Sequence, residues 1–157
     1  MSIVADVMTR DLQTVPPTAS VQDAALRMRT NNIGSLPVTI DSRLVGTITD
    51  RDITVRVIAE GRDPRSTLVR DAMTTGLFVL RPDQDLSEAE SLMKNHQIRR
   101  LPVVEDGGRL VGYVTMATIA KGEVDEKAVG RTLKGIFQPR KRDSQRFFPS
   151  ARAGAGG

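Results

Sequence analysis

The stretch VADVMT at residues 4–9 returns as VRDAMT at residues 69–74, which is 65 residues further along the chain. At the same offset, the Leu-Pro-Val triplet of residues 36–38 returns at residues 101–103. Self-similarity at one fixed spacing is the sequence signature of a repeated structural unit. The chain is therefore predicted to contain two copies of one unit.

A second shared motif shows where the copies end. Arg-Leu-Val-Gly at residues 43–46 returns at residues 109–112, now 66 residues later, because the turn before it holds one more residue. Gly61 is expected to stop the last helix of the first copy. The predicted organisation is repeat 1 at residues 1–61, repeat 2 at residues 66–121, and a C-terminal helix with a basic tail at residues 122–157.

Each copy shows the same order of local patterns. A short opening helix ends near Met-Thr, and a brief strand is expected to follow at residues 12–15 and at residues 77–80. An amphipathic helix comes next, with Ser20 or Asp85 in the N-cap position. Two short apolar runs joined by a tight turn then predict a β-hairpin, and a last helix follows it.

This β-α-β-β-α order predicts an α+β fold for each repeat. One such unit is too small to bury both faces of its sheet. We therefore expect the two copies to pack sheet against sheet as a pseudo-two-fold pair around one core, with two related clefts near the strand ends. Apolar residues at helical spacing in residues 124–136 predict a further helix that packs on the core or on a partner chain.

The composition excludes several kinds of site. The 157 residues include no cysteine and a single histidine, His96. This excludes disulfides, thiolate zinc sites, iron–sulfur clusters and a cysteine nucleophile, and a multi-histidine metal site within one chain. His96 has no evident carboxylate to orient it, so we predict no catalytic residue and no enzymatic activity. We also expect a cytoplasmic protein, because neither a signal-peptide pattern nor an apolar run of about 20 residues is visible.

The net charge of +4 is unevenly distributed. Residues 121–157 carry nine basic and four acidic side chains, whereas residues 1–120 sum to −1. Such a tail binds phosphates or acidic partners, or is simply solvated. It also places Phe147 and Phe148 beside basic residues, as proteins that bind single-stranded nucleic acids do. A nucleic-acid-binding protein acting through this tail therefore remains an alternative.

Two segments carry residues suited to a phosphorylated ligand. The stretch GTITDRD at residues 46–52 leads from a strand into a helix, whose first N–H groups favour an anion. Thr49 can donate its hydroxyl to a phosphate, and Asp52 can accept the hydroxyls of a ribose, but the same pair also fits a capping box. Arg99 and Arg100 precede a buried strand and can hold a phosphate, or can simply be solvated.

The repeated VxDxMT, IxxLPV and LVGxxT motifs resemble a tandem pair of CBS domains, or Bateman module, over about residues 1–121. The whole chain is similar to stand-alone bacterial CBS pairs of the hypoxic response protein group. The resemblance implies a non-enzymatic regulatory module that binds an adenosine-containing ligand (AMP, ADP, ATP or S-adenosylmethionine) between its repeats. We predict no cofactor and no metal site. The resemblance also implies a homodimer and an effector protein that the sequence does not name. A structural CBS pair without a ligand is the remaining alternative.

The resemblance also assigns roles to residues. It places Thr49 at a phosphate and Asp52 at the ribose, with the residues before each Leu-Pro-Val strand near phosphates. It places the purine among Thr14, Val15, Ile33 and Pro37. Thr118 replaces the acid in the second copy, so we expect one competent cleft, which combines the first motif with Arg99 or Arg100, and one degenerate cleft. The predicted ligand-binding residues are Thr14, Val15, Ile33, Gly34, Ser35, Pro37, Thr49, Asp50, Asp52, Arg99, Arg100, Thr115 and Thr118.

Overall fold

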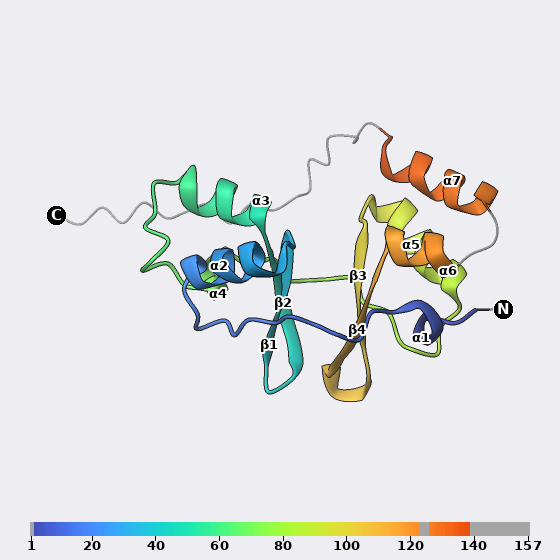
Figure 1. The fold of residues 1–157 in the computed structure, drawn as a ribbon, viewed down its shortest axis with the longest axis horizontal. Coiled ribbons are helices and arrows are strands. Elements are labelled where there is room, and N and C mark those ends of the chain that lie inside the picture. The colour runs from blue at the N-terminus through green and yellow to red at the C-terminus, as the bar shows by residue number, and fades with distance from the viewer. Residues whose placement is uncertain (1, 123–125, 139–157) are drawn as a thin grey trace.

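The computed structural model describes residues 2–122 and 126–138. Two similar halves lie side by side, each with a two-stranded sheet toward the middle and helices on its outer side (Figure 1). This confirms the predicted α+β class. The basic residues from Arg140 onward, with Phe147 and Phe148, lie outside the described residues.

The first half follows the predicted order of elements closely. Strands β1 and β2 pair in antiparallel fashion, with Leu36 opposite Ile48. Asp41 and Ser42 form the connecting turn with φ angles of 49° and 66°, so this is a tight hairpin of the kind the sequence predicted. The elements are α2 (Val21–Asn31), β1 (Ser35–Ile40), β2 (Arg43–Thr49), α3 (Asp50–Ile53) and a π-helical continuation (Thr54–Ile58).

The second half repeats this arrangement and adds one helix. Strands β3 and β4 are antiparallel, with Leu101 opposite Val114. Helix α7 packs against α5, and its Ile136 joins the buried core of this half, which confirms that the last predicted helix packs on the core. The elements are α5 (Leu86–His96), β3 (Arg100–Val104), a 3-10 turn (Asp106–Gly108), β4 (Leu110–Thr115), α6 (Met116–Gly122) and α7 (Glu126–Ile136).

The two opening helices are exchanged between the halves. Helix α1 (Val4–Val7) lies in the second half, where the Val4 N–H donates to the Gln84 carbonyl at 2.9 Å. Helix α4 (Val69–Ala72) lies in the first half, where the Val69 N–H donates to the Ala19 carbonyl at 2.8 Å. Figure 1 shows α1 beside β4 and α6, and α4 beside α2. Each half is therefore completed by the opening helix of the other sequence repeat.

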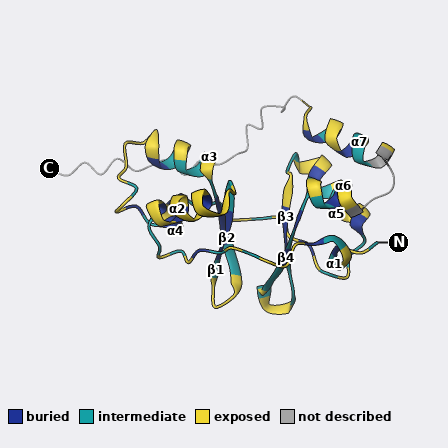
Figure 2. Cartoon of the chain, viewed as in Figure 1, coloured by how far each residue is buried: buried dark blue, intermediate teal, exposed yellow. Residues whose placement is uncertain are grey.

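The buried apolar residues form two clusters, so the expectation of one shared core was wrong (Figure 2). The exchanged and outer helices cover one face of each sheet. The other faces carry the pairs Pro37–Thr47 and Pro102–Tyr113, which are poorly suited to an aliphatic core. The fully buried members are Val15, Val21, Ala24, Leu36, Val38, Ile48, Val57, Val69 and Ala72 in the first cluster, and Val4, Leu80, Ala89, Met93, Leu101, Val103, Val114 and Ile119 in the second.

The strands expected at residues 12–15 and 77–80 are reduced to single bridges. Val15 pairs with Val38 and Leu80 with Val103, both in parallel fashion. The next bond in each ladder would need a backbone N–H from the proline of the Leu-Pro-Val triplet, and proline has none. Within the described residues, no helix has both the length and the apolar character needed to span a membrane.

Candidate ligand-binding site

Thr49 and Asp52 cap helix α3 through two reciprocal hydrogen bonds. The Asp52 N–H donates to Thr49 Oγ1 at 3.0 Å, and the Thr49 N–H donates to Asp52 Oδ2 at 3.0 Å. The capping alternative raised by the sequence is therefore present in the structure. It uses one carboxylate oxygen of Asp52, so the cap and a ligand contact through Oδ1 are compatible.

The second carboxylate oxygen of Asp52 contacts residues that the sequence analysis missed. Thr74 Oγ1 donates to Asp52 Oδ1 at 3.3 Å, and Arg56 Nη1 lies 3.8 Å from the same oxygen. Arg56 Nη1 also donates to the carbonyls of Ala72 and Met73, at 3.0 and 2.8 Å. The spacing of four residues between Asp52 and Arg56 was a visible signal, whereas the Thr74 contact depends on the exchange of α4.

Gly34, Ser35, Thr49 and Asp50 are brought together at the end of the first hairpin. Ser35 lies opposite Thr49 in the sheet, and the Asp50 N–H donates to the Gly34 carbonyl at 3.0 Å. A Cβ atom on Gly34 would lie 3.0 Å from Asp50 Oδ2, so the glycine allows this close approach. Asp50 Oδ1 also accepts the Arg51 N–H at 2.8 Å.

The residues expected around the purine differ in accessibility. The Val15 N–H donates to the Pro37 carbonyl at 3.1 Å, which places these two predicted residues side by side. Val15 is fully buried in the first core cluster. Thr14 is half-buried, and its carbonyl accepts a hydrogen bond from Arg27. Ile33 is exposed.

Arg99 and Arg100 have different surroundings. The Arg99 guanidinium lies 5.8 Å from the ring centre of Phe137 in the segment after α7, and it lines a cavity of about 250 Å³. Arg100 begins β3 opposite Thr115, on the strand face opposite the buried Leu101. Burial raises the pKa of the nearby Tyr113 to about 12, and the positive charge of Arg100 partly opposes this rise. Arg100 is thus the arginine on the sheet face that carries Tyr113.

Thr115 and Thr118 form the second copy of the cap without an acid. The Thr115 N–H donates to Thr118 Oγ1 at 2.9 Å, and the Thr118 N–H donates to Thr115 Oγ1 at 3.2 Å. The Thr118 hydroxyl donates to the Thr115 carbonyl at 2.9 Å. A neutral hydroxyl therefore performs the capping that Asp52 performs in the first copy, and no carboxylate is left for a ligand.

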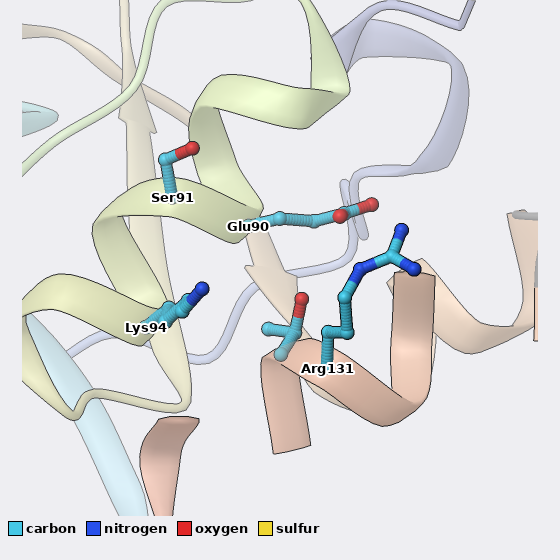
Figure 3. Close-up of a pocket in the computed structure, with 5 residues that line it drawn as sticks. Glu90, Ser91, Lys94 and Arg131 are labelled. Carbon is cyan, nitrogen blue, oxygen red and sulfur yellow. The ribbon is translucent and has the colours of Figure 1, made fainter. Parts of the chain in front are cut away.

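Another cavity, of about 140 Å³, lies between α5 and α7 and contains none of the predicted ligand residues. Figure 3 shows Glu90 and Arg131 approaching each other from the two helices, with Ser91 and Lys94 further along α5. Nowhere in the described residues do three or more His, Asp or Glu side chains gather in a group that could hold a metal ion.

Known sequences resemble the chain over most of its length. It is 41% identical to the CBS domain-containing protein YhcV of Bacillus subtilis over 136 residues, which cover 87% of this chain and 96% of that protein. It is 34% identical to hypoxic response protein 1 of Mycobacterium tuberculosis over 140 residues, covering 88% of this chain and 96% of that protein.

Two solved structures with bound ligands share the fold. The structure of CBSX2 in complex with AMP matches with a TM-score of 0.69 and 30% identity, over 78% of this chain and 96% of that chain. The CBS domain pair of protein MJ0100 was solved with 5′-methylthioadenosine and S-adenosyl-L-methionine. It matches with a TM-score of 0.68 and 27% identity, over 76% of this chain and 94% of that chain.

The family model for the CBS domain matches twice, at residues 4–58 and 69–125. These two matches correspond to the two copies seen in the sequence, and in the structure the opening helix of each copy lies in the other half. The chain belongs to the CBS-domain family and carries a tandem pair of these domains.

Proposed function

We propose that the chain is a non-enzymatic regulatory module that binds an adenosine-containing ligand (AMP, ADP, ATP or S-adenosylmethionine) between its two CBS domains. The observation that carries this proposal is the largely buried carboxylate of Asp52, which is joined to Thr49 of its own domain and to Thr74 of the other. Because this carboxylate contacts both domains, a ribose that binds to it can change how the two domains pack against each other. The ligands in the CBSX2 and MJ0100 structures support the adenosine class.

The roles within this site follow from what each residue offers. Asp52 accepts the ribose hydroxyls, and the Thr49 hydroxyl contacts a phosphate. Gly34 and Ser35 lie beside Thr49 and Asp50, where the Ser35 hydroxyl can donate to a phosphate. Arg100 supplies a charge that favours a phosphate over an uncharged group. Of the four residues expected to contact the purine, Thr14 and Ile33 are accessible, whereas Val15 and Pro37 are buried.

The second cleft, built on Thr115 and Thr118, is proposed to bind more weakly. A hydroxyl offers fewer hydrogen bonds to a diol than a carboxylate does, and none that is charge-assisted, which corresponds to about 1–3 kcal/mol. One competent cleft in each chain is therefore expected. A ligand there acts by binding one packing of the domains more tightly than another.

The proposal is tested by thermal unfolding with AMP, ADP, ATP, GTP and S-adenosylmethionine. A ligand at 100 times its dissociation constant adds about 2.7 kcal/mol, which raises the melting temperature by several degrees in a chain of this size. We expect Asp52→Ala to remove most of the shift and Thr118→Ala, its counterpart in the second domain, to retain it. Equal losses in both variants would refute the asymmetric site. No shift with any adenosine compound would refute the proposed function.

The homodimer and the effector protein stay proposals that rest on the family resemblance, and the cytoplasmic location stays a prediction from the sequence. Light scattering measures the mass of the protein in solution directly. It is done with and without whichever ligand the thermal-unfolding test identifies. A mass of one chain under both conditions would exclude the dimer. A mass of two chains would support the dimer. A two-fold arrangement is then expected, because two-fold homodimers are the commonest assemblies.

A further inference from the structure

The carboxylate of Asp52 is the meeting point of three chain segments. Its Oδ2 accepts the N–H of Thr49 in its own cap. Its Oδ1 is contacted by the Thr74 hydroxyl at 3.3 Å, after α4, and by Arg56 Nη1 at 3.8 Å, one helical turn further on. The side chain of Asp52 is only 13% exposed, so these partners largely determine its orientation.

Arg56 ties this carboxylate to the end of helix α4. Its Nη1 donates to the carbonyls of Ala72 and Met73, at 3.0 and 2.8 Å, and the last carbonyls of a helix have no partner within that helix. The guanidinium is planar, and its donors are fixed in one plane. The two bonds to the carbonyls therefore also fix the orientation of the Arg56 guanidinium relative to the Asp52 carboxylate. The position of the carboxylate therefore depends on where α4 lies.

Thr74 is held in place by its backbone, which leaves its hydroxyl to serve the site. The Thr74 N–H donates to the Thr47 carbonyl at 2.8 Å, and the Thr47 N–H donates to the Thr74 carbonyl at 3.0 Å. A hydroxyl that donates to a carboxylate still has acceptor capacity, and so does the carboxylate. Thr74 and Asp52 together can thus accept hydrogen bonds from two adjacent hydroxyls, the pattern presented by a ribose diol.

The second half of the molecule shows that the fold alone does not require this cluster. Thr9 occupies the position of Thr74 and makes the same pair of backbone bonds, with Tyr113, at 2.9 and 3.0 Å. Thr118 stands where Asp52 stands, and Gly122 stands where Arg56 stands. The backbone bridge is present in both halves, whereas the acid and the arginine belong to the first half alone.

We infer that Thr74 and Arg56 complete the ribose subsite around Asp52. Thr74 is a binding residue supplied by the second repeat, and its hydroxyl contacts the diol beside the carboxylate. Arg56 is a positioning residue, which orients Asp52 and links it to the end of α4. The inference rests on the proposed function, because it names the part of the same site that recognises the sugar.

The test measures dissociation constants of AMP and 2′-deoxy-AMP by calorimetry for the wild type and for Thr74→Val, which removes the hydroxyl at nearly constant volume. We expect a 3- to 10-fold loss of AMP affinity, the range for one hydrogen bond, and a smaller loss for 2′-deoxy-AMP. The affinity ratio between AMP and 2′-deoxy-AMP, which measures the preference for the ribose, is therefore expected to be smaller in Thr74→Val than in the wild type. Thr74→Ser keeps the hydroxyl and is expected to keep the preference. Thr9→Val is the matched control in the other half and is expected to change neither value.

Arg56 is tested by the same two ligands. Arg56→Met is expected to weaken AMP binding and narrow the same preference, whereas Arg51→Met, a change of an exposed arginine on the same helix, is expected to leave both unchanged. A wild-type protein that binds no adenosine nucleotide overturns the proposed function and this subsite with it. A wild type that binds AMP, with Thr74→Val or Arg56→Met retaining both its affinity and its ribose preference, overturns this inference alone. A Thr74→Ser variant that loses as much as Thr74→Val also overturns it.

Discussion

Gly46 lies directly against the backbone of Thr74, and a Cβ atom at Gly46 would come within 2.8 Å of the Thr74 carbonyl oxygen. The equivalent Gly112 lies against Met8, where a Cβ atom would come within 2.5 Å of the sulfur. The glycine of the LVGxxT motif therefore admits the segment exchanged from the other half. This explains its presence in both copies without any contact to a ligand.

Replacing Gly46 with alanine is expected to destabilise the fold by about 1–3 kcal/mol, because the neighbouring backbone cannot move without disturbing the Thr47–Thr74 bridge. Gly112→Ala is expected to cost less, since the flexible side chain of Met8 can change its rotamer. The free energy of unfolding in urea measures both changes.

Gly130 provides the control for these two variants, because no atom lies within 4 Å of the position its Cβ would take. Gly130→Ala is expected to stabilise α7 by up to about 1 kcal/mol, the difference in helix propensity. If Gly112→Ala proves as costly as Gly46→Ala, the distinction between a backbone and a side-chain neighbour is wrong.

Stability is expected to fall at alkaline pH because of Tyr113, the only tyrosine in the chain. Burial raises its pKa to about 12 in the folded state, against about 10 when unfolded. The unfolded chain therefore loses this proton first, and stability is lost as pH rises from about 10 to 12. The ultraviolet absorbance of tyrosinate reports the titration directly. The Tyr113→Phe variant should lack this share of the pH dependence, and an unshifted titration in the wild type would contradict the prediction.

Arg100 is expected to contribute more to phosphate binding than Arg99 does. Arg100→Met should weaken AMP binding by roughly 10-fold or more, the scale of a charge-assisted hydrogen bond, while adenosine binding changes little. Arg99→Met should leave both affinities nearly unchanged, because Arg99 lies against Phe137. Calorimetry with the two ligands distinguishes these effects, and a greater loss for Arg99→Met would reverse the assignment.

Helix α7 is expected to contribute to the stability of the second half through Ile136, which is 8% exposed. Ile136→Ala should lower the free energy of unfolding by about 2–5 kcal/mol, the usual range for a buried isoleucine. Leu133→Ala, at a position 37% exposed on the same helix, should cost less. Urea denaturation measures both, and equal costs would show that α7 does not pack as described.

The local elements were predictable because they depend on residues close in sequence. Duplicated motifs identified both hairpins, and the turn at Asp41 and Ser42 formed where polar residues separated two apolar runs. The capping role of Asp85 was predicted, although its side chain accepts the Ser87 N–H at 3.0 Å, two residues on. The strands expected at residues 12–15 and 77–80 did not form beyond single bridges, and the reason is also local. Pro37 and Pro102 lack the N–H donors that would extend these strands.

The exchange of α1 and α4 could not be predicted, because the two opening helices carry similar apolar patterns that do not show which core each one joins. Of the two missed contacts of Asp52, the one with Thr74 follows from this exchange. Arg56 lies at helical spacing from Asp52, but Thr74 is near Asp52 only because α4 belongs to the first half. The predicted combination of the first motif with Arg99 or Arg100 stays a prediction.

The exchange of the opening helices also makes the two halves dependent on each other. A chain cut in the connection near Asp63 would yield an N-terminal fragment that keeps α1 but lacks α4, and a C-terminal fragment with the opposite deficit. Each fragment would hold the piece that its counterpart lacks and would expose an apolar face without it. When mixed, the two fragments can reassociate into the complete fold. The duplicated chain is therefore one cooperative unit and not two independent domains.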